Sequence, residues 1–332
     1  MKKIFYVAIC FLVTYYGNSQ TAEEFINHGL SLYVSGDFQG AITEYSKALK
    51  VDRKSARAYN YRGLAKMKLY DLADYKKALE IDSTSQVYNR NMGFERTAHI
   101  NHEVIPDFSK AIKNDPKYAE AYYNRGVVKY CYENYKGAID DWTKAIQVNP
   151  KYVDAYNDRG LAKSIYQQFK GAIDDWTKAI EIDPKNVNAY NNRAVLNYNH
   201  QKYRVAIDDW TKVIQIDPKL AFAYINRGLA KIATKEYQGA LEDENKAIEI
   251  NPKSKVAYNN RGFAKSMLLD YQGATEDYNK AIEIDPKYPE AYSNRGVAKI
   301  KSGQKDEGCL DLRKAEKLGF AGAFQQIKEN CE

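Results

Sequence analysis

The sequence holds little of the material from which catalytic and metal centres are usually built. Its 332 residues include only four cysteines, four histidines, four methionines and three tryptophans. Nucleophilic and metal-dependent enzymes gather Cys, His or carboxylate side chains at one site, and so small a supply allows few combinations. The composition therefore argues against an enzyme and predicts neither a cofactor nor a catalytic metal.

Long apolar runs are also scarce, and a mean hydropathy of −0.65 excludes a polytopic membrane protein. One short run, residues 4–16, follows two lysines and precedes the small residues Gly17-Asn18-Ser19. This order is typical of a secretory signal peptide, and the run is shorter than the roughly 20 residues that a spanning helix needs. We expect residues 1–19 to direct bacterial export and to be cut after Ser19. The mature chain would then lack a membrane span and act in the periplasm or at the cell surface.

Charge of one sign is in modest excess, whereas one aromatic residue is abundant. A net charge of +7 is too small to predict a nucleic-acid partner on its own. Tyrosine occurs 29 times, against 11 phenylalanines. Such an imbalance indicates that one structural position is filled many times, which is the signature of a repeat.

The prolines reveal the period of that repeat. Six of the eight prolines are spaced 34 residues apart, at Pro116, Pro150, Pro184, Pro218, Pro252 and Pro286. Most are preceded by a Lys-Ala-Ile block and, further upstream, by an Arg-Gly pair. We expect nine repeats between residues 20 and 322, the second and third shortened, and a capping helix at 323–332. The predicted bounds of the repeats are 22–55, 56–85, 86–118, 119–152, 153–186, 187–220, 221–254, 255–288 and 289–322.

Each repeat is predicted to form two helices. In the fifth repeat the first helix carries Tyr156 and Gly160, and the second carries Ala172, Trp176 and Ala179 at the spacing of one helical face. Small residues allow two helix backbones to approach, and the large aromatic fills the space between neighbouring pairs. One helix pair cannot bury such a stripe alone, so the pairs must stack. Because this slot is an internal one, we favour a core role for the three tryptophans over a sugar-binding platform.

This pattern of aromatic, glycine, second aromatic, small residues and terminal proline resembles the tetratricopeptide repeat family over about 300 residues. The first aromatic position is filled in every predicted repeat: Phe25, Tyr59, Tyr88, Tyr122, Tyr156, Tyr190, Tyr224, Tyr258 and Tyr292. The resemblance implies an all-α fold, a right-handed superhelix of antiparallel helix pairs whose first helices line a concave groove. It also implies a protein that binds peptides or holds partners together, rather than an enzyme.

The same resemblance nominates residues around the glycine position as the groove lining. They are Tyr123, Val127, Tyr130, Asn157, Leu161, Asn191, Val195, Tyr198, Ile225, Leu229, Asn259 and Phe263. Apolar side chains alternating with amides suit an extended protein or peptide partner, and we expect Tyr123 and Tyr198 to be exposed aromatic anchors. The asparagines could equally cap or bridge helices. The alternative docking surface is the irregular region of repeats one to three, as in a structural subunit of a cell-envelope assembly.

A row of arginines precedes the glycine position in seven repeats. They are Arg62, Arg125, Arg159, Arg193, Arg227, Arg261 and Arg295. An acid stands just before the large aromatic of every second helix, so we expect an internal Arg–Asp ladder. The alternative is a basic stripe that binds a glycan or another anionic ligand.

Two places depart from the repeat pattern. His99, His102 and Glu103 fall where a turn between helices is expected in the third repeat, which also carries Pro106. A zinc site is the sharper interpretation of these histidines, although irregular turns often collect His. Glu244 occupies the slot that holds a tryptophan one repeat earlier, and we expect it to be partly exposed or paired with a Lys or Arg.

The end of the array predicts a disulfide. Phe324 and Ile327 would form the buried side of the capping helix. Cys309 and Cys331 lie equally far from a turn centred on residue 320, so an antiparallel helix pair places them opposite each other. Export supplies an oxidising compartment, and we therefore expect a Cys309–Cys331 bond, with Cys131 left unpaired.

Overall fold

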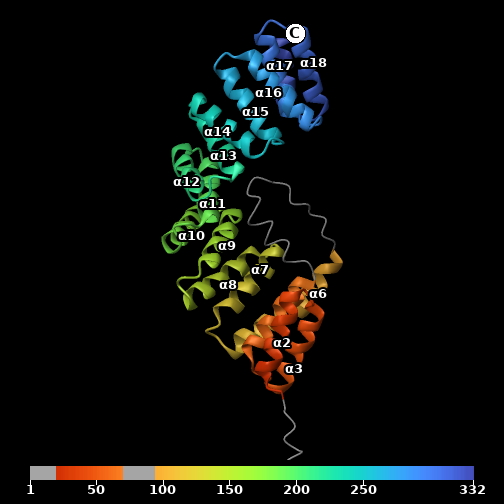
Figure 1. The fold of residues 1–332 in the computed structure, drawn as a ribbon, viewed down its shortest axis with the longest axis vertical. Coiled ribbons are helices and arrows are strands. Elements are labelled where there is room, and N and C mark those ends of the chain that lie inside the picture. The colour runs from red at the N-terminus through yellow and green to blue at the C-terminus, as the bar shows by residue number, and fades with distance from the viewer. Residues whose placement is uncertain (1–19, 70–93) are drawn as a thin grey trace, which may run out of the picture. The chain divides into compact units, whose positions relative to one another are not determined.

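A computed structural model describes residues 20–69 and 94–332 (Figure 1). Within these ranges the chain forms seventeen α-helices and no strand, which confirms the predicted all-α fold class. The chain divides into two compact units, Met1–Ile182 and Asp183–Glu332, and we describe each by itself. None of the described helices is both long enough and apolar enough to cross a bilayer.

The first unit contains eight described helices. They are α2 (Ala22–Ser35), α3 (Phe38–Val51), α4 (Ala56–Leu69), α6 (Phe94–Asn114), α7 (Ala119–Cys131), α8 (Tyr135–Val148), α9 (Val153–Ile165) and α10 (Phe169–Ile182). Consecutive helices pack as pairs, and each pair packs on the next along the chain. This is the stacked arrangement that the periodic sequence predicts.

The second unit continues the same pattern and ends on a shorter helix. Its helices are α11 (Val187–Asn199), α12 (Tyr203–Ile216), α13 (Ala221–Ala233), α14 (Tyr237–Ile250), α15 (Lys255–Met267), α16 (Tyr271–Ile284), α17 (Pro289–Lys301), α18 (Lys305–Lys317) and α19 (Ala323–Asn330). First helices also touch the next first helix, α13 with α15 and α15 with α17, so they share one face.

Local chemistry sets the turn inside each pair. The residue before the second helix's N-cap adopts a left-handed conformation, with φ of 58° at Glu133 and 91° at Gly303. The next amide then reaches back across the turn, as when Asn134 N–H donates to the Lys129 carbonyl at 2.9 Å. The Asn134 side chain in turn accepts from Gly137 N–H and caps α8.

The glycines of the first helices are notches that receive the large aromatic of the second helix. A Cβ atom on Gly126 would lie 2.6 Å from Trp142 Nε1, and one on Gly160 would lie 2.6 Å from Trp176 Nε1. Both indoles are almost fully buried, and Trp142 donates its N–H to the Tyr123 carbonyl at 3.1 Å. The tryptophans are therefore core residues, as predicted, and offer no platform to a sugar.

In the region of the second and third predicted repeats, 56–85 and 86–118, helix α4 packs on α6, whose Phe108 fills the notch at Gly63. In the other described pairs the ladder arginine bonds to an aspartate 16 residues later. Here Arg62 bonds to Asp107, which lies 45 residues later. Residues 70–93 stand between the two partners in sequence and lie outside the described residues. The predicted repeat bounds stay a prediction.

The expected turn at residues 99–103 is also wrong. These residues belong to the continuous helix α6, and Pro106 lies inside it. No Gly or Pro occurs between Phe94 and Ile105, so nothing in that stretch breaks a helix. The side chains of His99 and His102 lie outside the described part of the structure.

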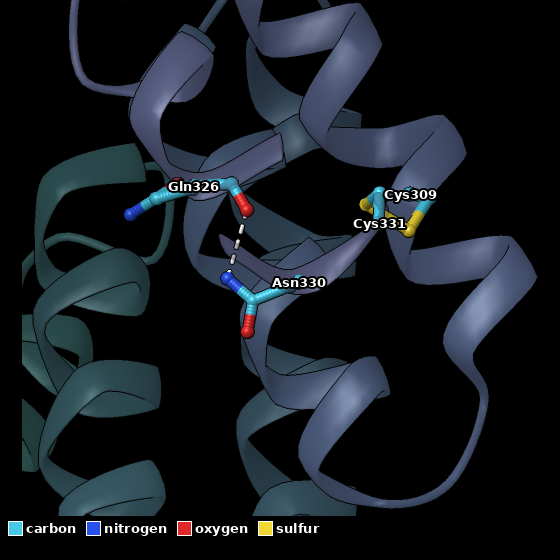
Figure 2. The surroundings of a disulfide bond; sticks show 4 residues. All are labelled: Cys309, Gln326, Asn330 and Cys331. Atoms are coloured by element: carbon cyan, nitrogen blue, oxygen red, sulfur yellow. Dashed lines mark hydrogen bonds between the residues drawn. A yellow bond between two sulfur atoms is a disulfide. The ribbon is translucent and has the colours of Figure 1, made fainter. Parts of the chain in front are cut away.

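The last helix is tied down by the predicted disulfide, which Figure 2 shows between Cys309 and Cys331. Helix α19 packs mainly on α18, and Gln326 accepts a hydrogen bond from Ser293 of α17 at 2.5 Å. Phe324 was predicted to be buried but is 66% exposed, while Ala323 is buried and Ile327 half-buried. A helix of eight residues covers little, and its register turns Ala323, rather than Phe324, towards the core.

Candidate functional site

The first helices of each unit carry the candidate binding residues, and these residues differ between the two units. In the first unit four of these residues, Tyr123, Val127, Tyr130 and Asn157, are buried. Tyr130 packs against Tyr135 and Trp142, with ring centroids 5.3 and 5.7 Å away. Leu161 alone of the predicted lining in this unit is half-buried.

Tyr123 is not the exposed anchor that we expected, because it is only 3% exposed. Its ring lies 4.9 Å from that of Tyr152, which comes from the loop before α9, and its hydroxyl donates to Asp158 Oδ2 at 2.8 Å. Burial and the nearby Asp158 carboxylate raise the pKa of the Tyr123 hydroxyl well above its usual range. The residue is part of the packing between α7 and α9.

In the second unit the first helices carry an apolar side chain at one repeated position. Val195, Leu229, Phe263 and Val297 follow one another at the repeat spacing on α11, α13, α15 and α17, and all four are half-buried. We call these four residues the apolar row. Our sequence prediction included the first three and missed Val297, which the 34-residue period identifies at once.

Beside the apolar row lie further half-buried side chains, among them the predicted Ile225 and Tyr198. Tyr198 is not fully exposed, because its ring packs 5.2 Å from Tyr203 and 6.0 Å from Trp210. Burial raises the pKa of its hydroxyl. Ile232 and Ile300 occupy the equivalent register on α13 and α17 and widen the apolar surface.

The asparagines of the predicted lining are used inside the protein. Asn191 and Asn259 are both buried. Asn191 Oδ1 accepts the indole N–H of Trp210 at 3.1 Å, and Asn259 Oδ1 accepts from the Asn294 amide at 3.0 Å. These amides therefore bridge helices, which was the alternative interpretation, and they are poorly placed to bind a peptide backbone.

The arginine row forms the predicted internal ladder. Arg159 makes two hydrogen bonds to the Asp175 carboxylate, at 2.9 and 2.6 Å, and a third to Thr143 Oγ1 of the preceding pair at 3.0 Å. Lys163 contacts the same carboxylate at 2.8 Å, and the guanidinium stands 5.6 Å from the Tyr156 ring. All seven arginines pair in this way with the acid of a second helix. The ladder consumes the charges that a basic stripe would need.

One rung of the ladder lacks its lysine. Asn197 stands where the other six rungs have Lys, so Arg193 is the cation that pairs with Asp209. Burial raises the pKa of the Asp209 carboxyl, against the opposing effect of Arg193.

Glu244 is neither partly exposed nor paired with a cation, contrary to our expectation. It is fully buried in the aromatic slot, and its Oε1 accepts from the Asn260 amide at 3.1 Å. Its second oxygen has no hydrogen-bond partner among the described residues. The nearby Arg227 and Arg261 are each bonded to an aspartate of the ladder.

The part of the chain that the structure describes holds no group of three or more His, Cys, Asp or Glu side chains that could bind a metal ion. Cys131 is a free thiol, and burial raises its pKa to about 12, so it is a poor nucleophile at neutral pH.

Comparison with known proteins agrees with the geometry. Profiles of the tetratricopeptide repeat match residues 119–152 and 223–254, and a further profile described as TPR repeat matches 29–69, 167–201 and 270–303. The matched segments together cover more than half of the chain and fall in both units. The chain is a tetratricopeptide repeat protein.

Individual relatives are distant. A TPR repeat-containing protein of Methanocaldococcus jannaschii is 28% identical over 120 residues, which are 34% of this chain and 21% of that protein. The match thus spans about a fifth of the relative's length.

Two solved structures share the fold. The C-terminal part of a TPR repeat-containing protein from Cytophaga hutchinsonii has a TM-score of 0.57 at 20% identity and covers 70% of this chain and 95% of its own. YrrB, described as a TPR protein with an unusual peptide-binding site, has a TM-score of 0.50 at 20% identity and covers 55% of this chain and 95% of its own. At such identity the likeness concerns the fold alone.

Proposed function

We propose that this protein is a non-enzymatic scaffold of the bacterial periplasm or cell envelope that binds a protein or peptide partner on its first-helix face. The observation that carries the proposal is the apolar row of Val195, Leu229, Phe263 and Val297, which stays partly exposed on four successive helices. A contiguous apolar strip on a protein surface marks a site of contact with another molecule. The peptide-binding site named for YrrB supports the same use of this fold.

The structure changes which residues we assign to the contact. The half-buried members of the predicted lining, Leu161, Val195, Tyr198, Ile225, Leu229 and Phe263, remain candidates. Val297 joins them, and the buried Tyr123, Val127, Tyr130, Asn157, Asn191 and Asn259 support the face from behind. Apolar side chains of the partner, rather than its backbone amides, would supply most of the affinity.

An exported location rests on two observations of different kinds. Residues 1–19 have the order of a signal peptide, and they lie outside the described residues. The Cys309–Cys331 disulfide fits an oxidising compartment, because reducing compartments keep cysteine thiols reduced. Determining the N-terminus of the exported protein tests the proposal: a mature chain that starts at Gln20 supports it, and retention of the protein in the cytoplasm contradicts it.

The contact surface is tested by site-specific photo-crosslinking in the bacterium. A photoreactive phenylalanine analogue at Phe263 should crosslink one partner, and the same analogue at Val205, an exposed residue of the second helix α12, should not. The partner, identified by mass spectrometry and purified, should bind at least tenfold more weakly to Leu229→Ser/Phe263→Ser than to the wild type. A matched control on second helices, Val205→Ser/Leu310→Ser, should bind normally.

Equal binding by both double variants would move the contact elsewhere. The second candidate is then a structural subunit of a cell-envelope assembly that docks through the irregular repeats one to three, where residues 70–93 separate α4 from α6 in sequence. Deleting residues 70–93 distinguishes the two, since only the second candidate loses its partner. The anionic-ligand alternative loses its basis, because the arginines are paired within the ladder.

A further inference from the structure

Glu244 is the one charged-type side chain in a slot that is otherwise filled by large apolar or aromatic residues. The equivalent residues of the described pairs are Tyr45, Phe108, Trp142, Trp176, Trp210, Tyr278 and Leu312. All are buried against the glycine or alanine notch of a first helix, and Glu244 takes the same place: a Cβ on Gly228 would lie 2.7 Å from Glu244 Oε1. The carboxyl therefore sits where α13, α14 and α15 meet.

The residues around Glu244 provide too few hydrogen bonds to offset the cost of burying a charged carboxylate. Oε1 accepts a single hydrogen bond from Asn260 of α15, and Oε2 is buried without a partner. A buried polar group without a partner destabilises the fold, and a buried charge without one does so far more. A neutral carboxyl is the form that this place tolerates.

The cations described around this carboxyl are already bonded to aspartates. On α14 itself, the adjacent Asp243 is an acid and disfavours a second negative charge. On α13, Arg227 and Lys231 are both bonded to Asp243, at 2.5 and 2.8 Å.

The other elements around the carboxyl offer no more. On α15, Arg261 is bonded to Asp277, and Tyr288 precedes α17 and is neutral at ordinary pH. Burial outweighs the help of Asn260 and Arg261 and raises the pKa of the Glu244 carboxyl well above its usual range.

The other repeats indicate which backbone carbonyl a protonated Glu244 would donate to. In α8 and α10 the indole N–H of the equivalent tryptophan donates to the carbonyl of the residue 19 positions earlier, Tyr123 or Asn157. The residue at that position for Glu244 is Ile225. A protonated carboxyl supplies an O–H donor for such a carbonyl, whereas a carboxylate can only accept.

We propose that Glu244 makes the junction of α13, α14 and α15 sensitive to pH: the junction closes on the protonated carboxyl and opens when the proton is lost. The sign follows from linkage. Because the folded state holds the proton more tightly than the unfolded state does, the junction is most stable below pH 4.5, the ordinary value of a glutamate, and loses stability as pH rises towards the folded-state value. One such group changes the opening equilibrium by up to about tenfold per pH unit in that window.

The test compares the full-length protein with two variants between pH 4 and pH 9. Glu244→Gln keeps the shape and removes the ionisation, and Glu242→Gln makes the same change at an exposed neighbouring residue of α14. Hydrogen exchange of the α13 and α15 amides, corrected for the chemical exchange rate, reports opening of this junction. We expect wild type and Glu242→Gln to open more as pH rises, by at least tenfold overall, and Glu244→Gln to stay flat.

A second variant keeps the proposal testable if Glu244→Gln folds poorly. Glu244→Trp restores the residue found in the three preceding pairs and should also abolish the pH dependence. The proposal is overturned if wild-type opening at this junction is independent of pH, or if both Glu244 variants keep the wild-type pH dependence. Opening confined to other helices would equally contradict it.

Discussion

Replacing Arg159 with methionine tests the ladder most directly, because methionine retains much of the apolar bulk and removes the guanidinium. Asp175 would lose two charge-assisted hydrogen bonds, of 2.9 and 2.6 Å, and would keep its contact with Lys163. Thr143 would lose its bond from the preceding pair. Hydrogen bonds to charged groups contribute about 1.5–3 kcal/mol each, and the remaining lysine offsets part of the loss, so we expect unfolding to become easier by about 2–3 kcal/mol.

The assay is urea unfolding, followed by tryptophan fluorescence, since Trp142 and Trp176 flank the rung in the core. Lys178→Met is the matched control, because it also breaks a Lys–carboxylate pair, the one between Lys178 and Glu181. Both of these side chains are about half exposed. Solvent already screens that pair, and we expect no measurable change. If Arg159→Met shifts the unfolding midpoint no more than Lys178→Met does, the ladder does not stabilise the array and our reasoning is wrong.

Three further changes probe other features of the array. Gly160→Ala should destabilise the protein, although alanine favours helix, because its Cβ would lie 2.6 Å from Trp176. The control is Gly171→Ala, whose Cβ would meet only the flexible Lys163 side chain at 3.3 Å, and it should be neutral or stabilising in the same melt. Asn197→Lys should add the missing cation beside Asp209 and raise the unfolding midpoint, and a lower midpoint would show that the site cannot accept the side chain. Cys331→Ser should cost about 3 kcal/mol by the chain-entropy estimate and should abolish the effect of reductant on the melting temperature; a free Cys331 thiol in non-reducing peptide maps of the exported wild type would contradict the bond.

The repeating features of this protein could be predicted from sequence because each occurs in many repeats. The Arg–Asp pairing and the tryptophan slot follow from helix periodicity and from fixed spacings. Averaging over repeats makes such predictions robust to the peculiarities of any one of them. The Cys309–Cys331 bond occurs once, and it could be predicted because the two cysteines lie equally far from one turn.

Single, local features were harder to predict. Tyr123 is buried because Tyr152 comes from a loop 29 residues later and covers it, and no helical spacing announces that contact. The pairing of α4 with α6 joins segments of two predicted repeats, and the 34-residue period does not announce it. The sequence shows that Glu244 departs from the repeat pattern. Its full burial could not be predicted, because that depends on how three helices pack around it.

The covalent tie at the last helix changes how the array comes apart. A terminal helix normally departs once its few contacts break, and its neighbour is then the next to go. Helix α19 cannot depart, because the Cys309–Cys331 bond keeps it beside α18 after every weaker contact has failed. Its return is an intramolecular event with a high effective concentration, so a brief opening is repaired before α17 and α18 follow. The disulfide therefore makes opening of the C-terminal helix reversible, instead of the first step in unfolding the array helix by helix.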